Sequence, residues 1–187
     1  MKKWSCDILR IGFLGACMCL ASPLGFSADA KNTDLSANWH KVASKQGNCT
    51  VKFPSSAERV SEKMKIDEVT EMQYEAYVSA SNEDTVFMML VAQYPDFVDE
   101  DFAQMSLEAF LNGILSHGAE AQLLFADLVL VQGYEGLDFF IRTGPNFFKG
   151  RVLMVKSQLY LLAMECKVSE YDEKGYEAFV NSFLLGH

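Results

Sequence analysis

The segment Thr85–Tyr94 (TVFMMLVAQY) constrains the fold more than any other part of the chain, because its apolar residues are consecutive and not only alternate. A strand with this pattern has to be covered on both faces, as the central strands of a sheet are. Pro95 follows at once and ends the strand, because proline has no backbone N–H to donate to a sheet. The sequence therefore predicts a sheet with a central strand at 85–94 and other elements packed on both of its faces.

Further strands are predicted on both sides of this segment by alternation and by β-branched and aromatic residues. Cys49, Val51 and Phe53 alternate with polar residues, and Ser157-Gln158 lies between two apolar arms as the turn of a hairpin. The other ranges with strand patterns are 58–66, 71–80, 120–131, 133–142, 147–156 and 159–167.

Two segments have the spacing of helices. Phe102–His117 is preceded by Asp101, which with Gln104 matches a capping box, and is followed by Gly118, a C-terminal cap. After Ser169 and Asp172, which suit a helix start, apolar residues recur at helical spacing: Tyr176, Phe179, Val180, Phe183 and Leu184. The order of strands, helix, strands and helix has no βαβ rhythm, so we predict an α+β fold, a sandwich of helices over an antiparallel sheet.

The first thirty residues have the layout of a secretory signal peptide. Lys2, Lys3 and Arg10 precede the apolar run 11–20, and Ala28-Asp29-Ala30 offers the small residues of a cleavage site. Cleavage would place the protein in the periplasm or outside the cell. We then expect a polar leader over 31–46, anchored by Trp39, and a single domain over 47–187.

Two other readings of the N-terminus remain open. Leu14-Gly15-Ala16-Cys17 resembles a lipobox, which would make Cys17 a lipid-anchored first residue. The apolar run could instead stay as a membrane anchor, although it is short for a span of about 30 Å. No later segment is long enough to cross a membrane.

Removal of the signal leaves two cysteines, Cys49 and Cys166. In an oxidising compartment they can form a disulfide that closes a very long loop and stabilises the protein by about 4 kcal/mol. Two buried free thiols on apolar strand faces are the alternative.

The residue inventory argues against several functions. A net charge of −9 does not suit a nucleic-acid partner, because phosphate binding needs clustered basic residues. No nucleophile elbow, HExxH, Walker or dinucleotide motif is present, so no catalytic, cofactor-binding or metal-binding residue is assigned.

Two charged groups are candidates for an interaction surface. Asp99, Glu100 and Asp101 precede the first predicted helix, where their main role is to favour its positive end. Lys149 and Arg151 share one face of a predicted strand and form a small cationic strip. Solvated charges at a sheet edge are the simpler interpretation of that strip.

The order of several short motifs resembles the PsbP-like family. They are Phe53-Pro54, Gln93-Tyr94-Pro95, Gly133–Asp138 (GYEGLD), Lys149–Val155 (KGRVLMV), Leu159-Tyr160-Leu161 and Phe179–Phe183 (FVNSF). The resemblance covers about residues 39–185 and extends to small exported bacterial proteins of that family. It implies an α/β/α sandwich around a central antiparallel sheet, and a non-enzymatic binding or assembly role.

Two functions follow as hypotheses. The first is an exported, non-enzymatic accessory protein that binds another envelope protein and needs no cofactor. The second is a periplasmic module that binds a small ligand, an apolar molecule or an ion, between sheet and helix.

Overall fold

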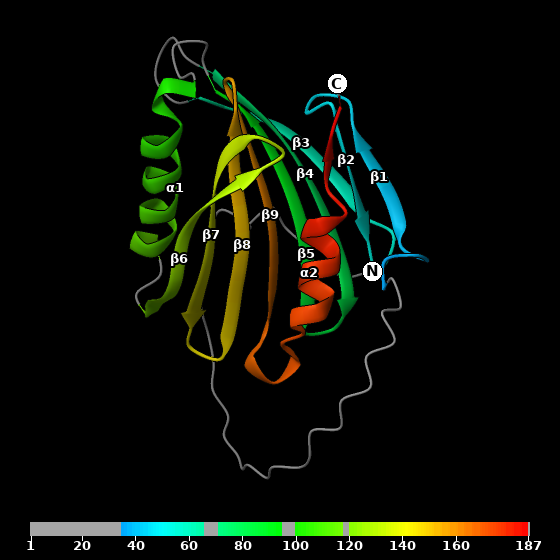
Figure 1. Cartoon of the computed structure of the whole chain (residues 1–187). Helices are drawn as coiled ribbons and strands as arrows, with labels where there is room; N and C mark the ends of the chain where they lie inside the picture. The colour runs from blue at the N-terminus through cyan, green and yellow to red at the C-terminus, as the bar shows by residue number, and fades with distance from the viewer. Residues whose placement is uncertain (1–34, 66–70, 95–99, 118–119, 187) are drawn as a thin grey trace.

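The computed structural model describes residues 35–65, 71–94, 100–117 and 120–186 (Figure 1). It contains ten strands and two α-helices within these ranges. The strands are β1 (His40–Ser44), β2 (Cys49–Phe53), β3 (Glu58–Lys65), β4 (Glu71–Asn82), β5 (Thr85–Gln93), β6 (Ala121–Val131), β7 (Tyr134–Thr143), β8 (Asn146–Val155), β9 (Gln158–Lys167) and β10 (Leu184–Leu185). The helices are α1 (Ala103–His117) and α2 (Glu173–Asn181), each preceded by a short 3₁₀ turn, η1 (Glu100–Phe102) and η2 (Val168–Glu170).

Seven of the strands form one antiparallel sheet in the order β3-β4-β5-β9-β8-β7-β6. Strand β5 lies between β4 and β9 in this order. Its residue Met89 is opposite Leu162 of β9, and both side chains are fully buried. The prediction of a central strand at this place is confirmed. The hairpin through Ser157 and Gln158 is also confirmed, since β8 and β9 pair from Val155–Gln158 outward.

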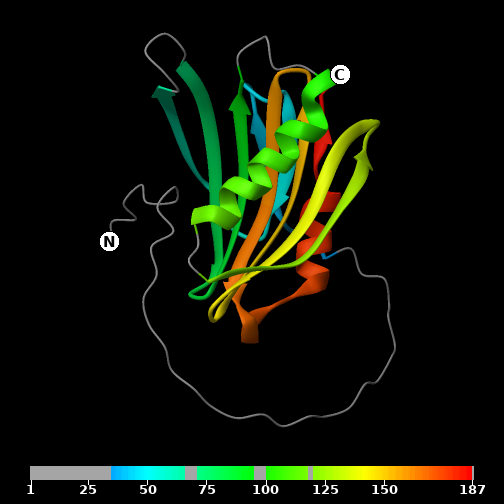
Figure 2. The same ribbon diagram turned by 90° about the vertical axis from the view of Figure 1, so that its left-hand side faces the viewer.

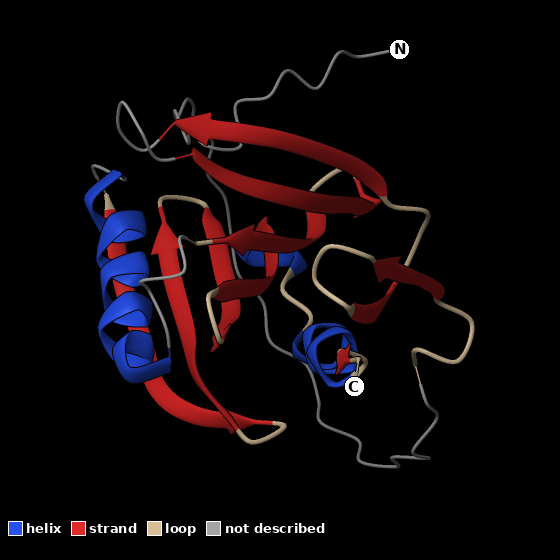
Figure 3. Cartoon of the chain, turned by 90° about the horizontal axis from the view of Figure 1, so that it is seen from above, coloured by secondary structure: helices blue, strands red, loops and turns tan. Residues whose placement is uncertain are grey.

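The two faces of this sheet carry different neighbours (Figures 2 and 3). Helix α1 contacts β6, β7 and β8, and its buried Leu107 joins a core cluster with Phe139 and Val152. Helix α2 contacts β9 and β2, and its buried Phe179 joins a second cluster with Met89 and Leu153. Successive residues of a strand point to opposite faces, so Val152 and Leu153 belong to different clusters. The α+β class is confirmed.

A small three-stranded sheet, β1-β2-β10, was not predicted as such. Strand β1 lies inside the range 31–46 that we expected to be a leader, and it pairs with β2 over its whole length. Trp39 packs edge-on against Phe87 of β5 at 5.9 Å between ring centroids. The pattern did not reveal β1 because this short edge strand places only Ser44 in a buried position.

The predicted helix ends need two corrections. Asp101 lies within η1 and not at the cap of α1, which begins at Ala103. Ser169, expected with Asp172 at the start of α2, lies within η2. Asp172 is itself the N-cap residue of α2, and its side chain makes no capping hydrogen bond. Gly118, the predicted C-terminal cap of α1, is outside the described residues. In the portion of the chain that is described, neither helix is both long and apolar enough for a membrane span.

The predicted disulfide is absent, and Cys49 and Cys166 are two buried free thiols. The thiol of Cys49 lies 3.8 Å from the sulfur of Met89, whose partner on β9 is Leu162. Cys166 lies four residues beyond Leu162 on β9, which places it roughly 13 Å from Leu162 at the usual rise of a strand. A disulfide needs its two Cα atoms within roughly 7 Å of each other, and none joins these two cysteines.

Candidate functional site

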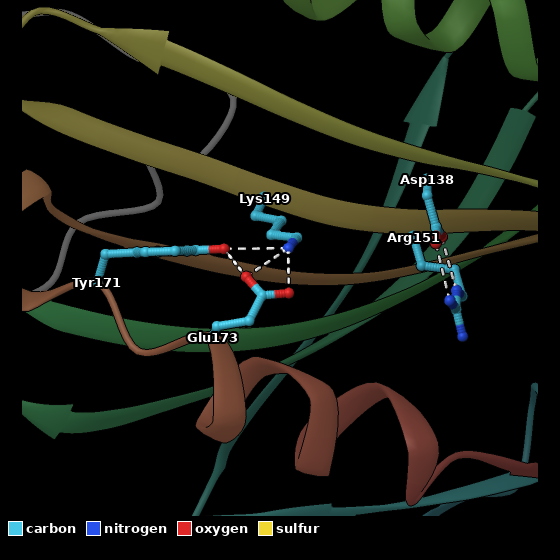
Figure 4. Close-up of polar contacts among 5 residues, drawn as sticks. All are labelled: Asp138, Lys149, Arg151, Tyr171 and Glu173. Atoms are coloured by element: carbon cyan, nitrogen blue, oxygen red, sulfur yellow. Dashed lines mark hydrogen bonds and ion pairs between the residues drawn. The ribbon is translucent and has the colours of Figure 1, made fainter. Parts of the chain in front are cut away.

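Lys149, one of the two residues of the predicted cationic strip, is half-buried and contacts residues at the start of α2 (Figure 4). Its ammonium group donates hydrogen bonds to both carboxylate oxygens of Glu173, at 2.6 and 2.7 Å, and to the hydroxyl of Tyr171 at 3.0 Å. The ring of Tyr176 lies 4.8 Å below the same group. Lys149 therefore joins β8 to α2 by an ion pair and a cation–π contact, and little of its charge is left for a partner.

Arg151, the other half of the strip, is neutralised by Asp138 of β7. Its guanidinium donates two parallel hydrogen bonds, at 2.6 and 2.8 Å, to the two oxygens of that carboxylate. Donation of these hydrogen bonds to Asp138 outweighs desolvation and raises the pKa of Arg151. Lys149 and Arg151 do share one face of β8, as predicted, but the contacts made there are internal.

Of the predicted acidic group, Asp99, Glu100 and Asp101, the structure describes the side chain of Asp101 alone. Asp99 lies outside the described residues, and Glu100 is in η1 with an undescribed side chain. Asp101 is exposed within η1.

The most exposed apolar surface lies on β6, the last strand of the large sheet. Half of the large apolar side chains found exposed in the described residues belong to this one strand. They are Leu123, Leu124, Phe125, Leu128 and Leu130, with exposures of 42 to 78%. We call these five side chains, with the unpaired backbone side of the strand, the β6 edge.

The β6 edge is apolar on both faces of the sheet. Leu128 pairs with Leu137 and so points to the face that α1 covers, whereas Phe125 pairs with Phe140 on the α2 face. A register shift between Leu123 and Phe125 leaves Leu124 as the extra residue of a bulge. The only charged side chain of the strand is Asp127.

The opposite edge of the sheet shows what an ordinary protected edge looks like. Strand β3 carries the charged residues Glu58, Arg59, Glu62 and Lys63, all of them exposed. Charges on an edge strand discourage pairing with another chain, and native proteins use them for that purpose. Strand β6 lacks this protection over most of its length, although its bulge and Asp127 are weaker devices of the same kind.

Sequence reasoning identified 120–131 as a strand but missed that it is an exposed edge. The signal was available in part, because the four apolar residues Leu128–Val131 are followed directly by Gln132 and Gly133, which read as a turn. A buried strand has the same apolar pattern, so only the strand order distinguishes the two.

A buried carboxylate links the two sheets on the α2 face. Glu75 of β4 is 3% exposed and accepts hydrogen bonds from Ser44 of β1, Tyr77 and Arg59. Burial alone would raise the pKa of Glu75, but these hydrogen bonds together outweigh it and lower the pKa. The arrangement is a structural ion pair that fixes β1 onto the large sheet.

Among the described residues, no group of three or more His, Cys, Asp or Glu side chains is placed to hold a metal ion.

Comparison with known proteins identifies the fold. No protein-family model matches the chain, and no curated protein matches it in sequence. The solution structure of cyanobacterial PsbP (CyanoP) from Synechocystis sp. PCC 6803 matches with a TM-score of 0.53 at 14% identity, covering 88% of this chain and 99% of that one. A crystal structure from Bacteroides thetaiotaomicron VPI-5482 matches with a TM-score of 0.40 at 8% identity, covering 79% of this chain and 48% of that one.

The strands and helices define an α+β protein built on an antiparallel sheet. The match to cyanobacterial PsbP, over nearly the whole of that structure, then gives this chain a PsbP-like fold and confirms the resemblance seen in the sequence. At such low identity the likeness concerns the fold alone.

Proposed function

We propose that this chain is an exported, non-enzymatic accessory protein that binds another protein of the cell envelope. The observation that carries the proposal is the β6 edge, where five large apolar side chains and an open strand backbone are exposed together. Contiguous apolar patches of this kind mark interaction sites on soluble proteins.

The edge suits a partner that contributes an extended apolar segment. Such a segment would add an eighth strand to the sheet, with backbone hydrogen bonds to the free N–H and C=O groups of β6. Its side chains would lie against Leu128 and Leu130 on one face and Phe125 on the other. Backbone pairing supplies affinity, and the apolar side chains select a partner strand that is apolar at alternate positions.

The proposal also includes export of the chain and the α/β/α layers that the family resemblance implies. The basic residues, apolar run and Ala28-Asp29-Ala30 site support removal of residues 1–30 by a signal peptidase. The contacts of α1 and α2 with different core clusters support an α/β/α sandwich. A lipid at Cys17 is the alternative form of the exported protein, and an intact mass distinguishes the two.

The test is site-specific photo-crosslinking in the intact envelope. A photoreactive phenylalanine analogue replaces Leu130, which is 78% exposed on β6, or Leu184, which is 57% exposed on β10. We expect a defined heterologous product from position 130 and none from position 184. Equal products from both positions, or a product with no second protein, would contradict the proposal.

A further inference from the structure

The one charged side chain of β6 lies in an unfavourable place for the isolated protein. Asp127 is directly opposite Asp138 of β7, and both side chains point to the α2 face, as Phe125 and Phe140 do two positions away. Like charges directly opposite each other on neighbouring strands destabilise a sheet. An uncompensated pair of carboxylates therefore lies in the middle of the apolar β6 edge.

Only one of these two carboxylates is paired within the described residues. Arg151 of β8 is opposite Asp138 and donates two hydrogen bonds to it, as Figure 4 shows. None of the ion pairs found among the described residues includes Asp127. The row of charges across β8, β7 and β6 is thus positive, negative and negative, and it ends at the open edge with an exposed carboxylate.

A strand added to this edge would extend the row of charges by one position. The Cβ atom of its residue opposite Asp127 would lie about 4.5–5.5 Å from the Cβ atom of Asp127, on the same face of the sheet. Opposite charges at such positions stabilise a pair of strands. A lysine or arginine there would give each of the two carboxylates a base of its own.

The neighbours of Asp127 on β6 specify the residues around that base. Ala126 and Leu128 are exposed and point to the α1 face, whereas Phe125, which is 48% exposed, lies on the α2 face two positions from Asp127. An added strand alternates in the same way. The residues next to its base would contact Ala126 and Leu128, and a residue two positions from the base would contact Phe125, so apolar residues suit these positions.

The charge around the edge favours a basic segment from another protein. Residues 120–135 include Glu120, Asp127 and Glu135 but no lysine or arginine, and the whole chain has a net charge of −9. A second copy of the chain that paired through its own β6 would therefore offer Asp127 no base. Complementary charge speeds association and suppresses wrong partners.

We propose that the strand that binds the β6 edge carries a lysine or arginine opposite Asp127, between apolar residues. The inference rests on the proposed function and specifies its partner. Backbone pairing and apolar contacts supply affinity, and the ion pair with Asp127 sets the register of the added strand. A slip of one residue would turn the base to the opposite face of the sheet, away from Asp127.

The product crosslinked at position 130 provides the first test. Mass spectrometry of the crosslinked peptide identifies the partner residue that lies against Leu130. We expect a lysine or arginine three positions from that residue, because Asp127 and Leu130 are three positions apart on β6. A partner segment without a base at or next to that position would overturn this inference alone. Absence of any product would overturn the proposed function and this inference with it.

Two variants of Asp127 test the ion pair through the Kd for that partner. Asp127→Asn removes the charge and should weaken binding about threefold, as loss of an exposed ion pair does. Asp127→Lys opposes the partner's base with a like charge and should weaken binding about tenfold or more. Neither variant should lower the urea concentration at which the isolated protein unfolds, because Asp127 is exposed and lies opposite a like charge there.

Glu135→Lys is the matched control, because it changes the net charge by the same amount as Asp127→Lys. Glu135 is exposed and lies opposite Leu130 on β7, one strand further from the partner. Its distance from the added strand is about 10 Å, beyond the screening length of about 8 Å at physiological salt, so the Kd should hardly change.

The decisive result is rescue by exchange of the two charges. A partner whose base is replaced by glutamate should bind Asp127→Lys more tightly than it binds wild type. Equal loss of affinity in Asp127→Lys and Glu135→Lys, or failure of the exchange to restore binding, would overturn the inference. Unchanged or tighter binding of the original partner to Asp127→Lys would show that Asp127 only protects the edge from pairing, and would overturn it as well.

Discussion

The pair of substitutions Leu128→Lys and Leu130→Lys is the sharpest test of the β6 edge. The two side chains are 52% and 78% exposed, so together they present slightly more apolar surface than one complete leucine. Burying one leucine side chain is worth about 1.5–3 kcal/mol. Loss of about 2 kcal/mol at the interface corresponds to a Kd that is about 30-fold weaker.

The same substitutions should hardly affect folding. Exposed side chains away from special features usually change the free energy of unfolding by less than about 0.5 kcal/mol. Lysine on an edge strand is also a natural protective residue. The variant should therefore unfold at nearly the wild-type urea concentration while its binding falls.

The assay immobilises the partner protein that the crosslinking experiment identifies and titrates it with wild type and with the variant. Each titration gives the Kd for the partner. Leu184→Lys is the matched control, because Leu184 is 57% exposed but lies on β10. A Kd that is unchanged in the β6 variant, or that rises equally in the control, would refute the reasoning. A wild-type protein that forms dimers lost in the variant would assign the edge to a second copy of this chain instead.

Three further predictions concern stability and reactivity. Gly150→Ala should destabilise the fold by about 1–3 kcal/mol in urea titrations, because the new methyl group would overlap the buried ring of Phe139. Gly113→Ala is the matched control: this glycine lies within α1 with open space around it, so the substitution should stabilise the fold by about 0.5–1 kcal/mol. Burial raises the pKa of Cys49 to about 12 and that of Cys166 to about 11, so both thiols should resist alkylation at pH 8 until urea is added, and rapid labelling of the native protein would contradict this. The folded-state pKa of Glu75 lies below its ordinary 4.5, so the contribution of its carboxylate to stability is present above pH 4.5 and is lost as the pH falls through the folded pKa. The difference in unfolding free energy between wild type and Glu75→Gln, about 1–3 kcal/mol at pH 7, should therefore close in urea titrations toward pH 2. A difference that does not depend on pH would count against the ion pair.

The main sheet and both helices were predictable because local patterns specify them. The run 85–94 predicted a strand covered on both sides, and β5 has neighbours on both edges and apolar clusters on both faces. The predicted stripe of α2 was correct through Val180, but the helix ends at Asn181. Phe183 is buried beyond the helix end, and Leu184 pairs with Thr50 in β10. A two-residue strand has no periodicity, so no pattern could have revealed it.

The candidate site was less predictable because it depends on contacts between distant segments. Lys149 and Arg151 share a face, as the period of a strand requires, but the sequence does not show that Glu173 and Asp138 neutralise them. The exposure of β6 depends on its place as the last strand, which follows from the order of the whole sheet. Local patterns thus predicted the elements, whereas their exposure and partners needed the tertiary structure.

Native mass spectrometry of the protein isolated from its own envelope tests the central claim most directly, because one spectrum reports cleavage, lipidation and bound molecules. The account predicts a chain of residues 31–187 with two free thiols, bound to a second polypeptide that is absent when Leu128→Lys and Leu130→Lys are introduced. A chain without any protein partner, or a partner that stays bound to this variant, would contradict the claim that the β6 edge is a protein-binding surface.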